Sequence, residues 1–148
     1  MFADFLSRLT APDPALLPDP DARLALGALL VRIAHSDGEY AHEEAERIER
    51  ILAARYGLSP FEATDLRRRS EALEGEAPDT VRFTRAIKDA VAYEEREGVV
   101  EALWDVVLAD GIRDEEEDGL LRLVAKLLGV NDRDSALARQ RVEARRAG

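Results

Sequence analysis

Residues 24–52 hold the strongest structural signal in the chain, and they read LALGALLVRIAHSDGEYAHEEAERIERIL. The segment Leu24–Ala34 is apolar on almost every side of a helix, interrupted chiefly by Arg32, so we expect a central and buried helix. Gly38 suits the left-handed residue that ends such a helix. The next helix starts with acidic residues, which complement its positive dipole end. Its apolar stripe is Ala41, Ala45, Ile48, Ile51, Leu52 and Tyr56, and Gly57 ends it.

The same pattern recurs 73 residues later, which is the separation of Asp37-Gly38 and Asp110-Gly111. The corresponding pairs are Leu30 and Leu103, Ile33 and Val106, Ala34 and Val107, Glu43 and Glu116, Glu44 and Glu117, Ile48 and Leu121, and Ile51 and Val124. Each half therefore contains a buried helix, an Asp-Gly turn, an acidic helix start and an amphipathic helix. Two such hairpins, packed through their central helices, would bury one core with approximate two-fold symmetry.

Further helices are predicted between and after these hairpins. Ser59 can cap a helix that Pro60 begins and whose capping box Glu62 completes, and this helix should run to about Leu73. Another should begin near Pro78 and carry Val81, Ile87 and Val91.

The second half gives the same kind of signal. Val99–Ala109, with Trp104 inside it, is again apolar nearly all round, and Trp104 is expected in the core. The next stripe is Leu120, Leu121, Val124, Leu127 and Leu128. Gly129 closes that helix, and Asn131 should cap a last one. No segment alternates like a strand, so the predicted fold class is all-α, with the duplicated hairpins packed as a single bundle.

Residues 1–20 are set apart by composition. Phe2, Phe5, Leu6 and Leu9 recur at helical spacing and predict a short amphipathic helix, which would fold back on the body or anchor the chain to a membrane or partner. A linker with Pro12, Pro14, Pro18 and Pro20 follows, in which no helix is expected. The all-helical domain is therefore assigned to residues 21–148.

Composition excludes several functional classes. The chain has 148 residues and no cysteine, which fits one domain without disulfides, thiol redox chemistry or thiolate metal sites. A net charge of −10 repels nucleic acid and anionic lipid and favours divalent cations or basic protein partners. No apolar run approaches the roughly 20 residues of a membrane helix, and no secretory signal is present. We therefore expect a cytoplasmic protein without stable membrane insertion or bound nucleic acid.

The two acidic turns are the candidate metal sites. Their carboxylates are Asp37, Glu39, Glu43 and Glu44 in the first turn, and Asp110, Asp114, Glu116 and Glu117 in the second. Hard oxygen ligands between helices suit calcium or magnesium, although the spacing is not that of an EF-hand. The alternative is helix capping, because Asp114 and Glu117 also form a capping-box pattern. Ala41 stands where the second turn has Asp114, so the first site should be the weaker one.

Other chemical signals are weak. His35 and His42 flank the first turn, where a histidine commonly interacts with the helix dipole. The arginines at 67–69 and 139–146 are expected to pair with acids or to remain solvated. The chain contains no phosphate loop, dinucleotide fingerprint or Gly-x-Ser-x-Gly motif. Catalysis is therefore not expected.

The sequence resembles the tellurite-resistance TerB family over residues 21–139. The resemblance rests on Ser36-Asp37-Gly38-Glu39 with Glu43-Glu44, on Ala109-Asp110-Gly111 with Glu116-Glu117, on Phe83–Lys88, on Tyr93–Arg96 and on Glu101–Trp104. It implies an all-helical, stress-associated scaffold that binds a divalent metal at its acidic turns. We accordingly expect a non-enzymatic interaction module with a protein partner. The alternatives are a metal-dependent hydrolase that uses the clustered carboxylates and a metal-free acidic adaptor.

Overall fold

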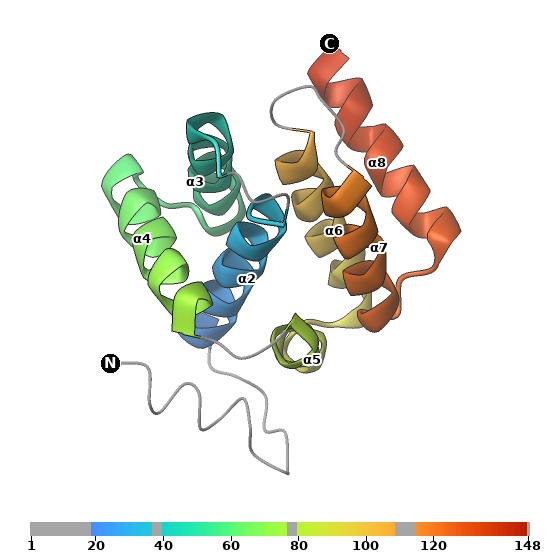
Figure 1. Ribbon diagram of the computed structural model, residues 1–148, viewed down its shortest axis with the longest axis horizontal. Helices are drawn as coiled ribbons and strands as arrows, with labels where there is room; N and C mark the ends of the chain where they lie inside the picture. Colours follow the sequence, from blue (N-terminus) through green and yellow to red (C-terminus); the bar gives the residue numbers. More distant parts are fainter. Residues whose placement is uncertain (1–18, 37–39, 77–79, 109–114, 148) are drawn as a thin grey trace.

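A computed structural model describes residues 19–36, 40–76, 80–108 and 115–147 (Figure 1). The helices are α2 (Asp19–Ala34), α3 (His42–Tyr56), α4 (Pro60–Glu76), α5 (Thr80–Ala90), α6 (Tyr93–Val107), α7 (Glu115–Leu127) and α8 (Asp132–Ala147). These described segments contain no strand, which confirms the all-α fold class. None of their helices is long and apolar enough to cross a membrane. The helix predicted near the N-terminus lies outside the described residues.

The two helices predicted to be central are buried and contact each other. From Leu24 to Ala34, only Arg32 retains appreciable exposure. In α6 and the residue after it, the side chains from Val99 to Leu108 are buried apart from those of Glu101 and Asp105. Burial of both helices on nearly every side removes a large apolar area from water, which is the main driving force for folding.

The duplication extends beyond the predicted hairpins to a third helix. Helix α4 packs on α2 and α3, and α8 packs on α6 and α7 in the same way. Figure 1 shows these two three-helix units side by side, with α5 between them at the lower side of the view. Ser59 and Asn131, which precede α4 and α8, are 72 residues apart. The offset between the two units is therefore 72 in their third helices. Helix α5 has no counterpart, and it packs on α2 and on α7.

The predicted helix ends are confirmed by local geometry. The Glu62 N–H donates to Ser59 Oγ at 3.2 Å, and the Ser59 N–H donates to Glu62 Oε1 at 2.9 Å. This capping box lowers the pKa of Glu62, because the Ser59 backbone N–H and then its hydroxyl stabilise the carboxylate. Asn131 Oδ1 accepts the Asp134 N–H at 2.8 Å. Gly57 and Gly129 end α3 and α7 at φ of 65° and 80°, where a side chain would be strained.

Three details differ from the sequence-based expectation. Helix α2 begins at Asp19, so Pro20 lies in its first turn instead of in the linker; proline is tolerated there because the first N–H groups have no partner within the helix. Helix α4 continues past Leu73 to Glu76. Val91, which was expected in the same helix as Val81 and Ile87, follows the last residue of α5, Ala90. Within α5, Thr84 and Ile87 are buried and Val81 is 45% exposed.

Trp104 is the largest fully buried side chain, at 2% exposure. Its indole Nε1–H donates to Ser135 Oγ in α8 at 3.2 Å. The hydrogen bond satisfies the only polar group of the ring, so that the ring can occupy the core without an unmet donor. Trp104 was predicted to belong to the core, and the structure confirms it.

Replacing Trp104 with Ala should lower the free energy of unfolding by about 3–5 kcal/mol, because it removes a large core aromatic. Trp104→Phe is the matched control; it keeps most of the buried area and should cost less. Urea denaturation followed by circular dichroism measures both values. Equal and negligible losses would contradict the packing described for this ring.

Helices α2 and α4 approach each other closely at Gly27 and Ser70. A Cβ placed on Gly27 would lie 2.0 Å from Ser70 Oγ and 2.9 Å from Ser70 Cβ. Both positions are buried. Gly27 is therefore required by packing, although glycine is unfavourable inside a helix by roughly 1 kcal/mol relative to alanine.

Gly27→Ala should destabilise the protein by about 1–3 kcal/mol through overpacking. Gly119→Ala is the control within a helix, because a Cβ there meets nothing within 4 Å, and it should be neutral or stabilising. Thermal unfolding of both variants measures the two changes in stability. The cost of Gly27→Ala should shrink in a Ser70→Gly background, and an unchanged cost there would exclude Ser70 as its cause.

Candidate functional site

Most of the eight predicted metal ligands cannot be placed. Asp37, Glu39, Asp110 and Asp114 lie outside the described residues, and the side chains of Glu116 and Glu117 in α7 are likewise not described. The side chains of Glu43 and Glu44 are described, in the first turn of α3. Within the described part of the chain, no three His, Asp or Glu residues form a group that could hold a metal ion.

Glu44 has a structural contact at the start of α3. Its side chain is 4% exposed, and Oε1 accepts the Ala41 N–H at 3.2 Å. This is the glutamate half of a capping box, made even though Ala41 has no side-chain acceptor of its own. Glu43 beside it is exposed. The capping alternative therefore holds for Glu44, while metal binding by the other carboxylates stays a prediction.

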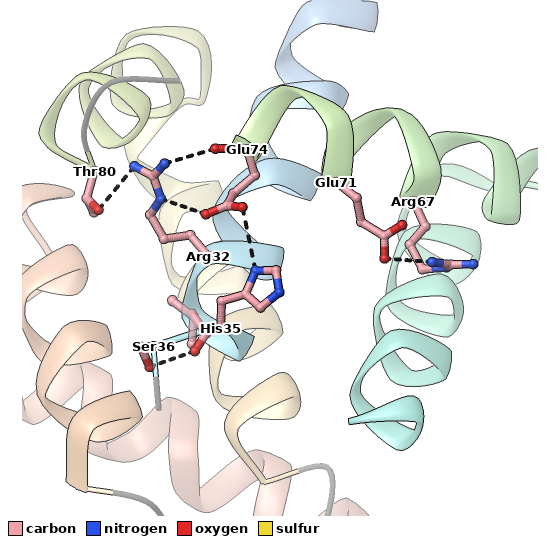
Figure 2. A network of polar contacts seen from close by, with 8 residues as sticks. Arg32, His35, Ser36, Arg67, Glu71, Glu74 and Thr80 are labelled. Carbon is pink, nitrogen blue, oxygen red and sulfur yellow. Dashed lines mark hydrogen bonds and ion pairs between the residues drawn. The ribbon is translucent and has the colours of Figure 1, made fainter. Parts of the chain in front are cut away.

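The C-terminal ends of α2 and α6, which precede the two Asp-Gly turns, both lie on the upper side of the view in Figure 1. Arg32 fixes the end of α2 (Figure 2). Its Nε lies 3.3 Å from Glu74 Oε1, and Nη2 donates to the Glu74 carbonyl at 3.2 Å. Nη1 donates to Thr80 Oγ1 at 3.5 Å. One guanidinium thus joins α2 to the end of α4 and the start of α5.

His35 and Ser36, which follow α2 directly, make further polar contacts. His35 Nδ1 lies 3.5 Å from Glu74 Oε2, and Ser36 Oγ donates to the Ile33 carbonyl at 2.8 Å. The His35 ring also meets Tyr40 edge-on, with centroids 4.6 Å apart. Because His35 and Tyr40 stand on either side of the first Asp-Gly turn, their contact brings the two flanks of that turn together.

Tyr40 lies close to charged residues of α4. Burial raises the pKa of its phenol, and the neighbouring Glu71 carboxylate raises it further. Arg67 Nη1 lies 2.7 Å from Glu71 Oε2, and Arg67 Nε lies 3.4 Å from Glu49 Oε1 in α3. The phenol therefore stays protonated at neutral pH, which favours a positioning role over proton transfer.

The second unit fixes the end of α6 by a related ion pair. Asp105 Oδ1 lies 3.0 Å from Arg146 Nη2, which also donates to the Asp105 carbonyl at 2.7 Å. Arg47 of α3 approaches the same carboxylate at 3.9 Å and so links the two units.

The two ion pairs occupy equivalent positions with their charges exchanged. Arg32 corresponds to Asp105 at the offset of 73, and Glu74 corresponds to Arg146 at the offset of 72. In both units the last turn of the central helix is therefore tied to the last turn of the third helix, through a side-chain ion pair and a bond to a main-chain carbonyl. Sequence analysis missed this feature. Extending the repeat through α4 and α8 would have aligned the four positions, although their residue types differ.

A double-mutant cycle on Arg32 and Glu74 should give a coupling energy of about 1–2 kcal/mol in unfolding, because both side chains are only 16% exposed. Chemical denaturation of Arg32→Ala, Glu74→Ala and the double variant measures it. Arg69 and Asp65 supply the control, since that pair is 51% and 58% exposed and should couple by no more than about 0.5 kcal/mol. Equal coupling energies in the two cycles would contradict a structural role for the Arg32 pair.

Comparison with known proteins gives one match. The family model described as tellurite resistance protein TerB matches residues 23–140, which include most of α2, all of α3 to α7 and part of α8. No curated protein and no solved structure matches the chain.

Proposed function

We propose that this chain, which belongs to the TerB family of tellurite resistance proteins, is a non-enzymatic helical interaction module of a stress response. We further propose that its two Asp-Gly turns bind calcium or magnesium and that its acidic surface contacts a basic protein partner.

The observation that carries this proposal is the matched anchoring of α2 and α6. Arg32 with Glu74, and Asp105 with Arg146, hold the two helix ends that lead into the acidic turns. Both ends lie on the same side of the molecule (Figure 1). A scaffold whose helix ends are held in place suits ligand or partner binding, because less conformational entropy is lost on association.

The chemistry of the donor set favours the second turn. The carboxylates predicted around the first Asp-Gly pair are Asp37, Glu39, Glu43 and Glu44, and Ala41 stands where the second turn has Asp114. The second pair is accompanied by Asp110, Asp114, Glu116 and Glu117. Calcium takes six to eight oxygen ligands, so the carboxylate of Asp114 at the position of Ala41 is expected to make the second turn the tighter site.

The charge of the chain supports a basic partner. A net charge of −10 accelerates encounter with a positively charged surface and disfavours acidic competitors. A cation bound at the turns would reduce the local negative charge, so cation binding and partner binding would influence each other.

Calcium should raise the melting temperature of the metal-free protein, because it binds the folded state and relieves repulsion between clustered carboxylates. Differential scanning calorimetry at millimolar calcium, compared with sodium chloride of equal ionic strength, measures the shift. Asp110→Asn should remove more of that shift than Asp37→Asn.

The two variants control for each other, because each removes one charge next to a glycine in an equivalent turn. Equal residual shifts would refute the proposed asymmetry. No shift in the parent protein would refute cation binding and leave capping as the role of the acidic helix starts.

A further inference from the structure

A cavity of about 260 Å³ lies between α6, α7 and α8 of the second unit. Its lining residues are Trp104, Arg122, Asp132, Ser135, Ala136 and Arg139. Sites for drug-sized ligands usually measure about 300–1,000 Å³, so this cavity suits a smaller ligand.

The equivalent position in the first unit holds a carboxylate that the second unit lacks. Glu49 of α3 corresponds to Arg122, and Arg67 of α4 corresponds to Arg139. In the first unit Glu49 accepts a hydrogen bond from Thr64 and forms an ion pair with Arg67, whose Nε lies 3.4 Å away. In the second unit an arginine replaces that carboxylate, and Ala136 stands in the place of Thr64. An internal acceptor has therefore been replaced by a second guanidinium.

Ser135 adds a buried donor to the cavity. It is 6% exposed, and its Oγ accepts the Trp104 indole N–H at 3.2 Å. Among the described residues, none accepts the hydrogen of the Ser135 hydroxyl, which leaves it to donate to a ligand. A buried hydroxyl without an acceptor costs free energy, and an oxygen-rich ligand in the cavity would remove that cost.

Arg139 is held in place for binding. Its guanidinium carbon lies 5.7 Å from the centre of the Trp104 ring, and its Nε lies 3.0 Å from Glu143 Oε1. Arg122 of α7, which is exposed to solvent, also lines this cavity. Asp132 is the opposing charge in the lining, and its position in the first turn of α8 places it where the helix dipole partly offsets it.

We propose that this cavity binds a phosphate group, either as inorganic phosphate or as a small phosphomonoester, through Arg122, Arg139 and Ser135. Two guanidinium groups and a hydroxyl supply directed donors to a tetrahedral dianion, and arginine matches phosphate oxygens with paired N–H groups. This proposal does not depend on the function proposed for the acidic turns.

The fluorescence of Trp104 tests this proposal directly, because Trp104 is the only tryptophan of the chain and lines the cavity. Inorganic phosphate and glycerol 3-phosphate are titrated separately at constant ionic strength. We expect a saturable change with at least one of them, and the one that binds more tightly identifies the source of the phosphate group.

Arg122→Glu gives the second unit the charge that Glu49 has in the first, and it should weaken binding at least about tenfold. Arg68→Glu is the matched control, an equal charge change on an exposed residue of α4, and it should leave binding unchanged. Asp132→Asn should tighten binding, because it removes the carboxylate that competes for the guanidinium groups. Circular dichroism checks the fold of each variant, and Arg122→Gln replaces Arg122→Glu if the latter unfolds.

The absence of a saturable change in the parent protein with both probes would overturn the proposal. Equal weakening by Arg122→Glu and Arg68→Glu would also overturn it, because the effect would then come from the overall charge.

Discussion

The rest of the structure depends on the burial of two helices that are apolar on nearly every side. A single partner covers only one face of a helix, so a helix of this kind has to be surrounded. Helix α2 is covered by α3, α4, α5, α6 and α7, and α6 by α2, α3, α7 and α8. The three-helix unit is thus the smallest repeat that covers most of a central helix, and pairing the two units covers the remaining side. Helix α5 connects the units and also covers α2.

This constraint explains why the sequence predicted the centre of the fold better than its periphery. The segments Leu24–Ala34 and Val99–Ala109 could be identified because every side of each helix has to be apolar. Helices α4 and α8 are amphipathic only in part, and their polar residues differ in type between the two units. An ion pair needs opposite charges but does not specify which helix holds which charge. Arg32 and Glu74 could therefore be replaced by Asp105 and Arg146 with the same geometric result, and comparison of residue types does not reveal it.

The prediction of metal ligands met a different ambiguity, because the same acidic residues can serve several purposes. Acidic residues at a helix start are equally suited to cap the helix, to offset its dipole and to hold a cation. Sequence spacing is the same in all three cases, so the side-chain direction has to decide. At Glu44 the carboxylate turns back to the Ala41 N–H and is buried, which is the capping geometry. Ala41 did not abolish the cap, because the glutamate half of the box needs only the backbone of that residue.

The duplication also separates what the scaffold requires from what each unit has acquired. Positions that preserve burial or charge pairing in both units, such as the ion pairs at the ends of α2 and α6, are accounted for by the scaffold that the two units share. Positions where one unit loses an internal partner are not. At Glu49 and Arg122 the two units differ in the sign of a charge next to an equivalent arginine, and Val31 of the first unit is replaced by Trp104 in the second. A stable core would be served as well by the arrangement of the first unit, in which Glu49 is paired with Thr64 and Arg67. The second arrangement leaves a cavity whose lining holds two arginines and one carboxylate. A requirement outside the fold, such as a bound anion, gives this excess of positive charge a physical reason.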